Sequence, residues 1–150
     1  QIDADNIDAL GIPVVQLDTD GACHIEAESI NHILPQFDLD TLDILFVENI
    51  GNLVCPAEFN IGESFRIAVL SIPEGDDKVP KYQLMFSTCD ALVMNKYDMM
   101  PYFEFDDKRV ENDEKGVNPN ASIFRVSSKD EKSLDSLITW MTGRIDEVTK

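Results

Sequence analysis

Residues 42–62 read LDILFVENIGNLVCPAEFNIG, and this stretch decides the expected fold. It opens with the large apolar residues 44–47, a run typical of a strand buried on both faces of a parallel sheet. Glu48 follows directly, and Gly51 comes three residues later. An acidic residue after a buried strand lies at the carboxyl edge of the sheet, where open α/β sheets bind their ligands. The stretch therefore predicts an α/β fold with a ligand site at this edge.

The pair Glu48 and Gly51 fits one kind of ligand site in particular. In P-loop nucleotidases a strand of this kind ends in an acidic residue that reaches the bound Mg²⁺. A glycine near the terminal phosphate lets the backbone bend without a Cβ. We therefore assign Glu48 and Gly51 to a catalytic role that senses Mg²⁺ and the γ-phosphate. The alternative is a polar loop in which Glu48 only caps a turn.

Composition limits the domain count and the partners. The 150 residues, 43% of them hydrophobic, suffice for one core and are too few for two ordinary domains, so we expect a single domain over residues 1–150. A net charge of -17 disfavours nucleic acid and anionic membranes as partners, because both require a basic face. No apolar run approaches the roughly 18 residues of a membrane span, and no signal peptide is recognisable, so we expect a cytoplasmic protein.

The hydrophobic pattern alternates between strands and helices. Apolar runs typical of strands cover residues 14–17, 44–47, 65–72, 91–94 and 122–126, with a turn-rich loop at 73–80. Helical patterns cover residues 3–10, 23–34, 106–115 and 134–148, with a short buried turn or helix at 82–86. This alternation predicts a mostly parallel sheet flanked by helices, with right-handed crossovers.

Four polar clusters follow predicted strands, at residues 18–24, 48–55, 95–98 and 127–129. In a parallel sheet, segments that follow the strands meet at one edge. We therefore expect all four clusters to converge on one functional site.

Two of these clusters resemble the base-binding loops of G proteins. The segment NKYD, residues 95–98, matches the guanine-recognition element, in which the carboxylate of Asp98 accepts two parallel hydrogen bonds from the base. Asn95 and Lys96 complete the element. Residues 127–129, SSK, resemble the second base-contacting loop and contribute Ser128 and Lys129. An ordinary turn after a strand is the alternative for NKYD taken alone.

Cys23, His24 and Cys55 form a third constellation. Thiolate and imidazole groups suit Zn²⁺ or Ni²⁺, but one chain supplies at most three such ligands here. A symmetric dimer that brings two sets together is the sensible arrangement for a metal. The alternative is two small buried cysteines and an isolated histidine. We interpret Cys89 as a core residue and His32 as a surface residue.

Taken together, ENIGNLVCPAEF at residues 48–59 and the motifs above closely resemble the HypB family of nickel-incorporation GTPases in hydrogenase maturation. The resemblance implies GTP and GDP as ligands, Mg²⁺ held by Glu48 and Asp3, and Ni²⁺ or Zn²⁺ bound at a homodimer interface. It also implies that GTP hydrolysis is coupled to metal release. The implied partners are a nickel-carrying hydrogenase accessory protein and the hydrogenase large subunit.

One element of that family does not occur in this sequence. No G-x-x-x-x-G-K-[ST] motif is present, so we expect a P-loop NTPase fold of G-domain type that lacks the N-terminal P-loop strand and helix. The chain begins with Gln, and we expect the missing element upstream, so this chain alone should be a poor GTPase.

Two alternatives stay open. One is a nucleotide-free module that binds nickel or zinc, and the other is a urease-type nickel GTPase, whose Cys-Pro-His tripeptide does not occur here.

Overall fold

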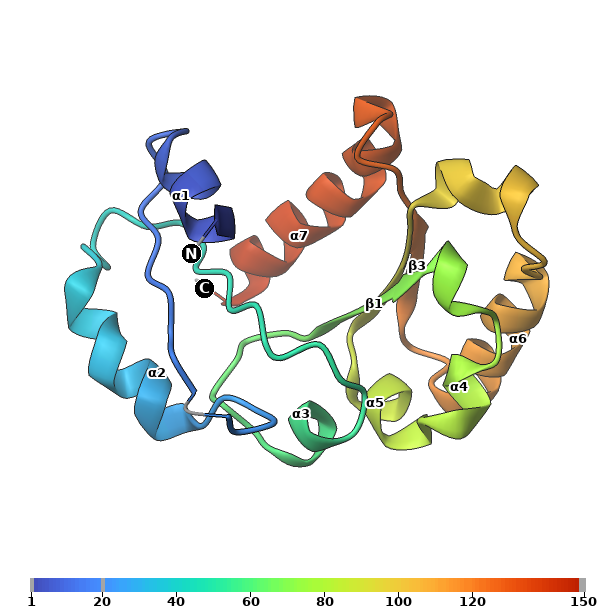
Figure 1. The fold of residues 1–150 in the computed structure, drawn as a ribbon, viewed down its shortest axis with the longest axis horizontal. Coiled ribbons are helices and arrows are strands. Elements are labelled where there is room, and N and C mark those ends of the chain that lie inside the picture. The colour runs from blue at the N-terminus through green and yellow to red at the C-terminus, as the bar shows by residue number, and fades with distance from the viewer. Residues whose placement is uncertain (1, 20, 149–150) are drawn as a thin grey trace. The chain divides into compact units, whose positions relative to one another are not determined.

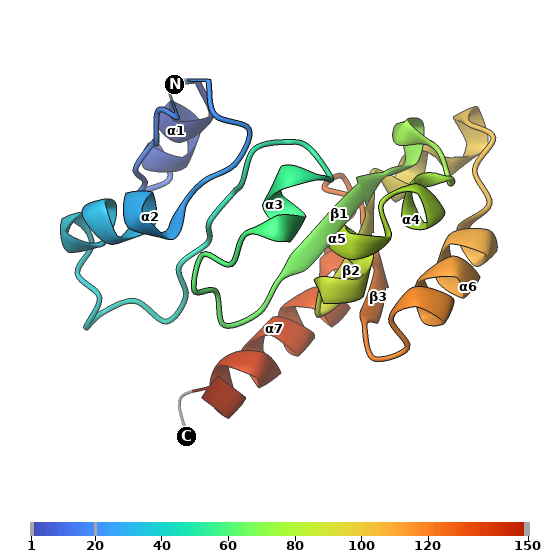
Figure 2. The same cartoon turned by 90° about the horizontal axis from the view of Figure 1, so that it is seen from below.

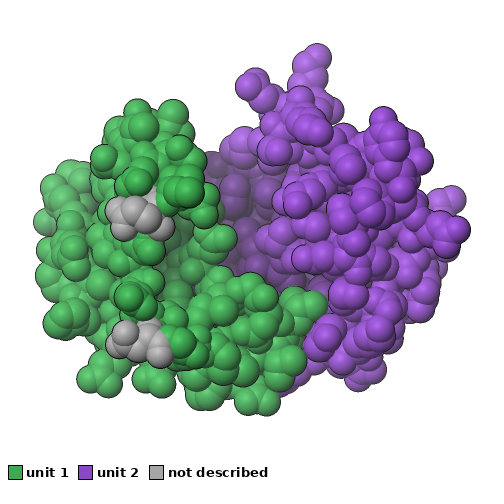
Figure 3. Space-filling view, in the orientation of Figure 1, with its two compact units in different colours: residues 1–62 green, residues 63–150 purple. Residues whose placement is uncertain are grey.

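The computed structural model describes residues 2–19 and 21–148. They form two compact units, one within residues 1–62 and one within residues 63–150. Figure 3 colours the first unit green and the second purple. Within the described ranges, no helix is long and apolar enough to cross a membrane.

Unit 1, residues 1–62, consists of short helices joined by irregular segments. The helices are α1 (Ile2–Asp8), α2 (Ala27–Ile33), the 3-10 turn η1 (Leu34–Gln36) and α3 (Cys55–Glu58). The buried side chains are few: Ile25, Ile30, Pro56 and Ala57. The prediction of a helix near the amino terminus is confirmed by α1.

The two strands predicted in unit 1 are wrong. Residues 14–17 and 44–47 are irregular, and the described part of unit 1 contains no strand. Phe46 is 67% exposed, although its run has the composition of a buried strand. A strand needs a neighbour to pair its backbone N–H and C=O groups, and apolar composition alone does not supply that neighbour.

The predicted helix at 23–34 begins later than expected. Helix α2 starts at Ala27, so Cys23 and His24 precede the helix and do not lie in its first turn. The reason is that nearby side chains bind the backbone here. Asn52 Nδ2 donates to the carbonyl of Cys23 at 2.6 Å, and the N–H of Ile25 donates to Asn49 Oδ1 at 3.1 Å. These backbone groups are therefore paired without a helix.

Unit 2, residues 63–150, is built on a parallel sheet. Its strands are β1 (Ile67–Ser71), β2 (Ala91–Asn95) and β3 (Ser122–Arg125), in the order β1-β2-β3. Val69 of β1 is in register with Val93 of β2, and Val93 with Phe124 of β3. The strands predicted at 65–72, 91–94 and 122–126 are confirmed, each with slightly different ends.

Helices cover both faces of this sheet. The α-helices are α4 (Lys78–Lys81), α5 (Gln83–Thr88), α6 (Asp107–Val117) and α7 (Asp135–Val148), with 3-10 turns η2 (Ile72–Glu74), η3 (Tyr97–Tyr102) and η4 (Glu131–Leu134). Helix α7 lies on one face, and α4, α5 and α6 lie on the other (Figures 1 and 2). The helices predicted at 82–86, 106–115 and 134–148 are confirmed. The loop predicted at 73–80 is confirmed for residues 75–77, whereas η2 and the start of α4 occupy the rest of it.

The core of unit 2 lies around the middle strand. Residues 91–94 of β2 are buried without exception, as expected for a central parallel strand. Leu70, Phe86 and Val110 pack around it and are at most 1% exposed. Two of the four polar clusters, residues 95–98 and 127–129, follow observed strands of this sheet. The other two clusters follow segments of unit 1 that form no strand, so the expected convergence of all four clusters stays a prediction.

Candidate functional site

The loop after β2 has the backbone of a binding loop. Lys96 adopts a left-handed conformation, with φ 56° and ψ 40°, which non-glycine residues seldom adopt outside tight turns and functional sites. Its N–H donates to Oδ1 of Asn95 at 2.7 Å, and the N–H of Tyr97 donates to the carbonyl of Val126 at 3.0 Å. The residue before Asp98 is therefore hydrogen-bonded to the residue that follows β3.

The Asp98 carboxylate is held by the second loop. Its Oδ1 accepts a hydrogen bond from Ser127 Oγ at 2.7 Å, and its Oδ2 lies 3.1 Å from Lys129 Nζ. These two contacts, first the hydroxyl and then the ammonium, hold the pKa of Asp98 below its usual value. An ionised carboxylate offers about four acceptor positions, so two remain for a ligand.

Two serines that were not predicted as site residues organise the second loop. Ser127 is 4% exposed, and its Oγ both donates to Asp98 and accepts from the N–H of Lys129 at 3.2 Å. Ser133 Oγ accepts from the N–H of Ser127 at 2.9 Å and donates to the carbonyl of Asp130 at 2.6 Å. Ser128, which was predicted as a site residue, has an exposed side chain. Ser127 could have been predicted from its place just after the strand that is followed by the SSK loop, because a hydroxyl there can reach the carboxylate of the NKYD loop.

This arrangement can recognise a base that presents two adjacent N–H donors. Asp98 is ionised, fixed in place and 31% exposed, so it can accept a parallel pair of hydrogen bonds. Guanine presents such a pair, and adenine does not. The structure thus brings Asp98 and Lys129 together, with Asn95 and Lys96 in the same loop.

In unit 1, two of the predicted metal ligands lie together. The sulfur atoms of Cys23 and Cys55 are 2.7 Å apart, and both residues are free thiols. The hydrogen bond from Cys23 raises the pKa of the Cys55 thiol. A cation at this place would favour the thiolate forms, since metal ligation requires deprotonated cysteine.

His24 lies next to this pair of thiols. Its Nδ1 lies 3.6 Å from Cys23 Sγ, and its ring stacks on Phe59 with centroids 3.8 Å apart. Its Nε2 is buried, forms no hydrogen bond in the described part of the chain and lies 3.8 Å from Oε1 of Glu26. An imidazole beside two thiols fits a soft transition metal. Among the described residues, however, no three His, Cys, Asp or Glu side chains form a complete metal site.

The turn at Glu48–Gly51 is connected to these donors by asparagines. Asn49 follows Glu48 and accepts from Ile25 N at 3.1 Å, while Asn52 follows Gly51 and donates to Cys23 O at 2.6 Å. Oδ1 of Asn52 also accepts from Cys55 N at 2.9 Å. The backbone on both sides of His24 is therefore bonded to the side chains of these two asparagines.

The predicted Mg²⁺ ligands have a simpler setting. Asp3 lies in the first turn of α1, and Glu48 lies in the irregular segment before α3. Both are exposed, and so is Gly51. Their roles toward Mg²⁺ and phosphate stay predictions.

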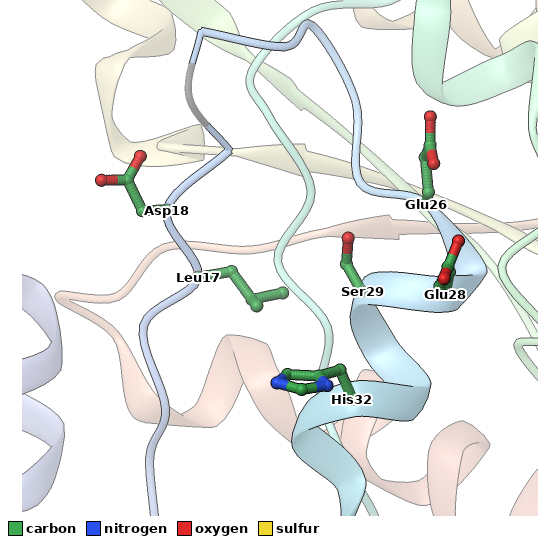
Figure 4. Close-up of a pocket in the computed structure, with 6 residues that line it drawn as sticks. All are labelled: Leu17, Asp18, Glu26, Glu28, Ser29 and His32. Atoms are coloured by element: carbon green, nitrogen blue, oxygen red, sulfur yellow. The ribbon is translucent and has the colours of Figure 1, made fainter.

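Unit 1 also contains a hollow of about 340 Å³ beside α2 (Figure 4). Its lining residues are Leu17, Asp18, Glu26, Glu28, Ser29 and His32. In Figure 4 the side chains of Ser29 and His32 come from α2, whereas Leu17 and Asp18 come from the irregular segment before it. The predicted metal ligands are not among the lining residues, but the lining residue Glu26 lies 3.8 Å from Nε2 of His24.

Comparison with known proteins decides the family. Residues 1–125 match the family described as the CobW/HypB/UreG nucleotide-binding domain. The crystal structure of HypB from Helicobacter pylori in complex with nickel superposes with a TM-score of 0.91 and 40% sequence identity, covering 97% of this chain and 69% of that one. The chain belongs to the HypB family. The predicted resemblance to this family is thereby confirmed.

Further HypB proteins give the same result. HypB of Archaeoglobus fulgidus superposes with a TM-score of 0.89 at 32% identity, over 97% of this chain and 70% of that one. The hydrogenase maturation factor HypB of Escherichia coli strain K12 is 40% identical over 139 residues, which are 93% of this chain and 48% of that protein. The chain thus spans about half the length of curated HypB relatives that it matches.

Proposed function

We propose that the longer protein to which this chain belongs is a GTPase that delivers nickel during hydrogenase maturation. The observation that carries the nucleotide part is the convergence of two loops on Asp98, which Ser127 and Lys129 hold in its ionised form. Mg²⁺ and the γ-phosphate are assigned to the turn at Glu48–Gly51, with Asp3 as a further Mg²⁺ ligand.

The metal part rests on Cys23, His24 and Cys55. The paired thiols and the imidazole of His24, whose Nδ1 lies 3.6 Å from Cys23 Sγ, form an incomplete set of soft donors. A homodimer supplies the second set, so that Ni²⁺ or Zn²⁺ is shared between two chains. The Helicobacter pylori HypB structure that superposes on this chain is a complex with nickel, which supports nickel as the cargo.

The proposed sequence of events couples the two sites. GTP and Mg²⁺ order the turn at Glu48–Gly51, and hydrolysis to GDP releases it. The asparagine contacts then alter the positions of Cys23 and Cys55, so that the metal is passed to the hydrogenase large subunit. A nickel-carrying accessory protein loads the site.

Binding measurements on the full-length protein test this proposal. We expect GDP to bind at least 100-fold more tightly than ADP, since a fixed acceptor site rejects a base that lacks its donors. We also expect Ni²⁺ binding that is lost in Cys23→Ser and Cys55→Ser. Nickel binding without any guanine preference would instead support the nucleotide-free metal module.

A further inference from the structure

A side chain on helix α6 holds the base-recognition loop from outside. Tyr97, directly before Asp98, donates a hydrogen bond from Oη to Oδ2 of Asp107 at 2.8 Å. The same oxygen accepts a hydrogen bond from Nε of Arg125 at 2.9 Å. One carboxylate oxygen at the start of α6 therefore joins the loop after β2 to the last residue of β3.

Arg125 extends this connection to the second base loop. It lies two residues before Ser127, whose hydroxyl bonds to Asp98. Its guanidinium also donates from an Nη atom to Oε2 of Glu111 at 2.8 Å. Two carboxylates one turn apart on α6 thus fix the guanidinium, and a charge-assisted pair of this kind is geometrically specific.

The network is sheltered enough to hold its geometry. The side chains of Asp107, Glu111 and Arg125 are 20%, 29% and 32% exposed. Arg125 and then Tyr97 hold the pKa of Asp107 below its usual value, so Asp107 stays ionised and accepts both hydrogen bonds. Partly buried ion pairs such as the two that Arg125 forms are screened less than exposed surface pairs.

We propose that Asp107 and Arg125 are positioning residues for guanine recognition. They fix the Tyr97 side chain and the end of β3, and thereby hold the Asp98 carboxylate at the distance from Ser127 that a paired guanine edge requires. Neither residue touches the base. The inference rests on the proposed function, because it assigns further residues to that same nucleotide site.

Nucleoside diphosphates that differ by one group test this role. IDP differs from GDP only in lacking the 2-amino group, so the ratio of GDP to IDP affinity in the full-length protein reports one of the two hydrogen bonds to Asp98. We expect Tyr97→Phe and Arg125→Gln to lower GDP affinity by about three- to tenfold, which is the range for one lost hydrogen bond. The GDP to IDP ratio should fall by a similar factor, and Arg125→Lys should restore part of it.

A matched control is Arg109→Gln. Arg109 lies on the same helix but pairs with Asp76 and Asp113 instead of Asp107, so its loss should leave both affinities unchanged. Wild-type GDP to IDP ratios in Tyr97→Phe and Arg125→Gln would overturn the positioning role while leaving guanine recognition intact. A wild-type protein that binds GDP and ADP equally would overturn both proposals. Tyr97→Phe removes a single hydroxyl, so it keeps the test informative if Arg125→Gln does not fold.

Discussion

The thiol of Cys89 donates a hydrogen bond to Oε1 of Glu114 at 3.5 Å, and both side chains are buried. Glu114 is 0% exposed, and its Oε2 has no hydrogen-bond partner among the described residues. Burial disfavours the charged forms of both groups. It raises the pKa of Glu114 to about 7 and that of Cys89 to about 12. Glu114 is therefore mostly protonated inside the fold below neutral pH.

This burial predicts that stability falls as pH rises. The pKa of Glu114 is raised from 4.5 to about 7, so the folded state binds the extra proton between these values. The stabilising contribution is complete below pH 4.5 and is lost as pH rises through about 7. Between pH 5 and pH 8 we expect a loss of about 2 to 3 kcal/mol in the free energy of unfolding.

Urea unfolding of the wild type and of Glu114→Gln at both pH values measures this loss. Glutamine cannot ionise, so the variant should gain about 2 to 3 kcal/mol relative to the wild type between pH 5 and pH 8. Glu131→Gln at an exposed site serves as the control and should show no such gain. A difference between wild type and Glu114→Gln that does not change with pH would show that Glu114 has an ordinary pKa.

The second prediction concerns the start of α6. Asp106 is the N-cap residue, and its Oδ1 accepts hydrogen bonds from the N–H groups of Lys108 at 3.1 Å and Arg109 at 3.0 Å. We expect Asp106→Ala to lower the free energy of unfolding by about 1 kcal/mol, because two N–H groups of the first turn lose their acceptor. Asp106→Ser retains a capping oxygen and should recover most of this in thermal unfolding. Equal stabilities of the Ala and Ser variants would argue against the cap.

The third prediction concerns the base. Asp98→Asn replaces one acceptor oxygen with a donor, so it opposes one of the two guanine N–H groups. We expect GDP and GTP affinity of the full-length protein to fall by about 10- to 100-fold. Xanthine nucleotides should bind relatively better, because their 2-oxo group can accept from the new amide. Isothermal titration with GDP and XDP measures this change in base preference. An unchanged preference for GDP would show that Asp98 does not contact the base.

The sheet of unit 2 could be predicted because the hydrophobic pattern of each strand is visible in its local sequence. Residues 91–94 are apolar without interruption and flanked by polar residues, and this pattern leaves few alternatives to a central strand. Residues 44–47 have a similar composition, yet they form no strand. The difference is the availability of a pairing partner, which depends on the fold and not on the local sequence.

Some residues of the candidate site could likewise be predicted from the local sequence, and others could not. Asp98 and Lys129 were predictable from short motifs, since their chemistry depends on adjacent residues. Ser127 and the contacts of Tyr97 with Asp107 depend on pairs 10 to 29 positions apart in the chain, which motif spacing does not reveal. The position of Cys23 and His24 before α2 was missed because the side chains of residues 49 and 52 capture the backbone there.

The last prediction concerns the coupling of nucleotide and metal. Asn52 adjoins Gly51 of the proposed phosphate-sensing turn and contacts both cysteines of the proposed metal site. Its Nδ2 donates to Cys23 O, and its Oδ1 accepts from Cys55 N. A movement of this turn must therefore displace backbone at both cysteines, and we expect Ni²⁺ affinity of the full-length protein to differ by about five- to 150-fold between the GDP state and a non-hydrolysable GTP analogue.

Asn52→Asp isolates this connection. Aspartate keeps the acceptor for Cys55 N–H but loses the donor to Cys23, so the nickel affinities in the two nucleotide states should move toward each other. Asn60→Asp introduces the same charge at a residue whose Oδ1 accepts from Gly62 N, and it should keep the wild-type difference. Linkage requires that Ni²⁺ change GTP affinity by the same factor as GTP changes Ni²⁺ affinity, so both titrations are measured. Equal nickel affinities in the two states of the wild type would leave Cys23, His24 and Cys55 as a static site and remove the proposed release step.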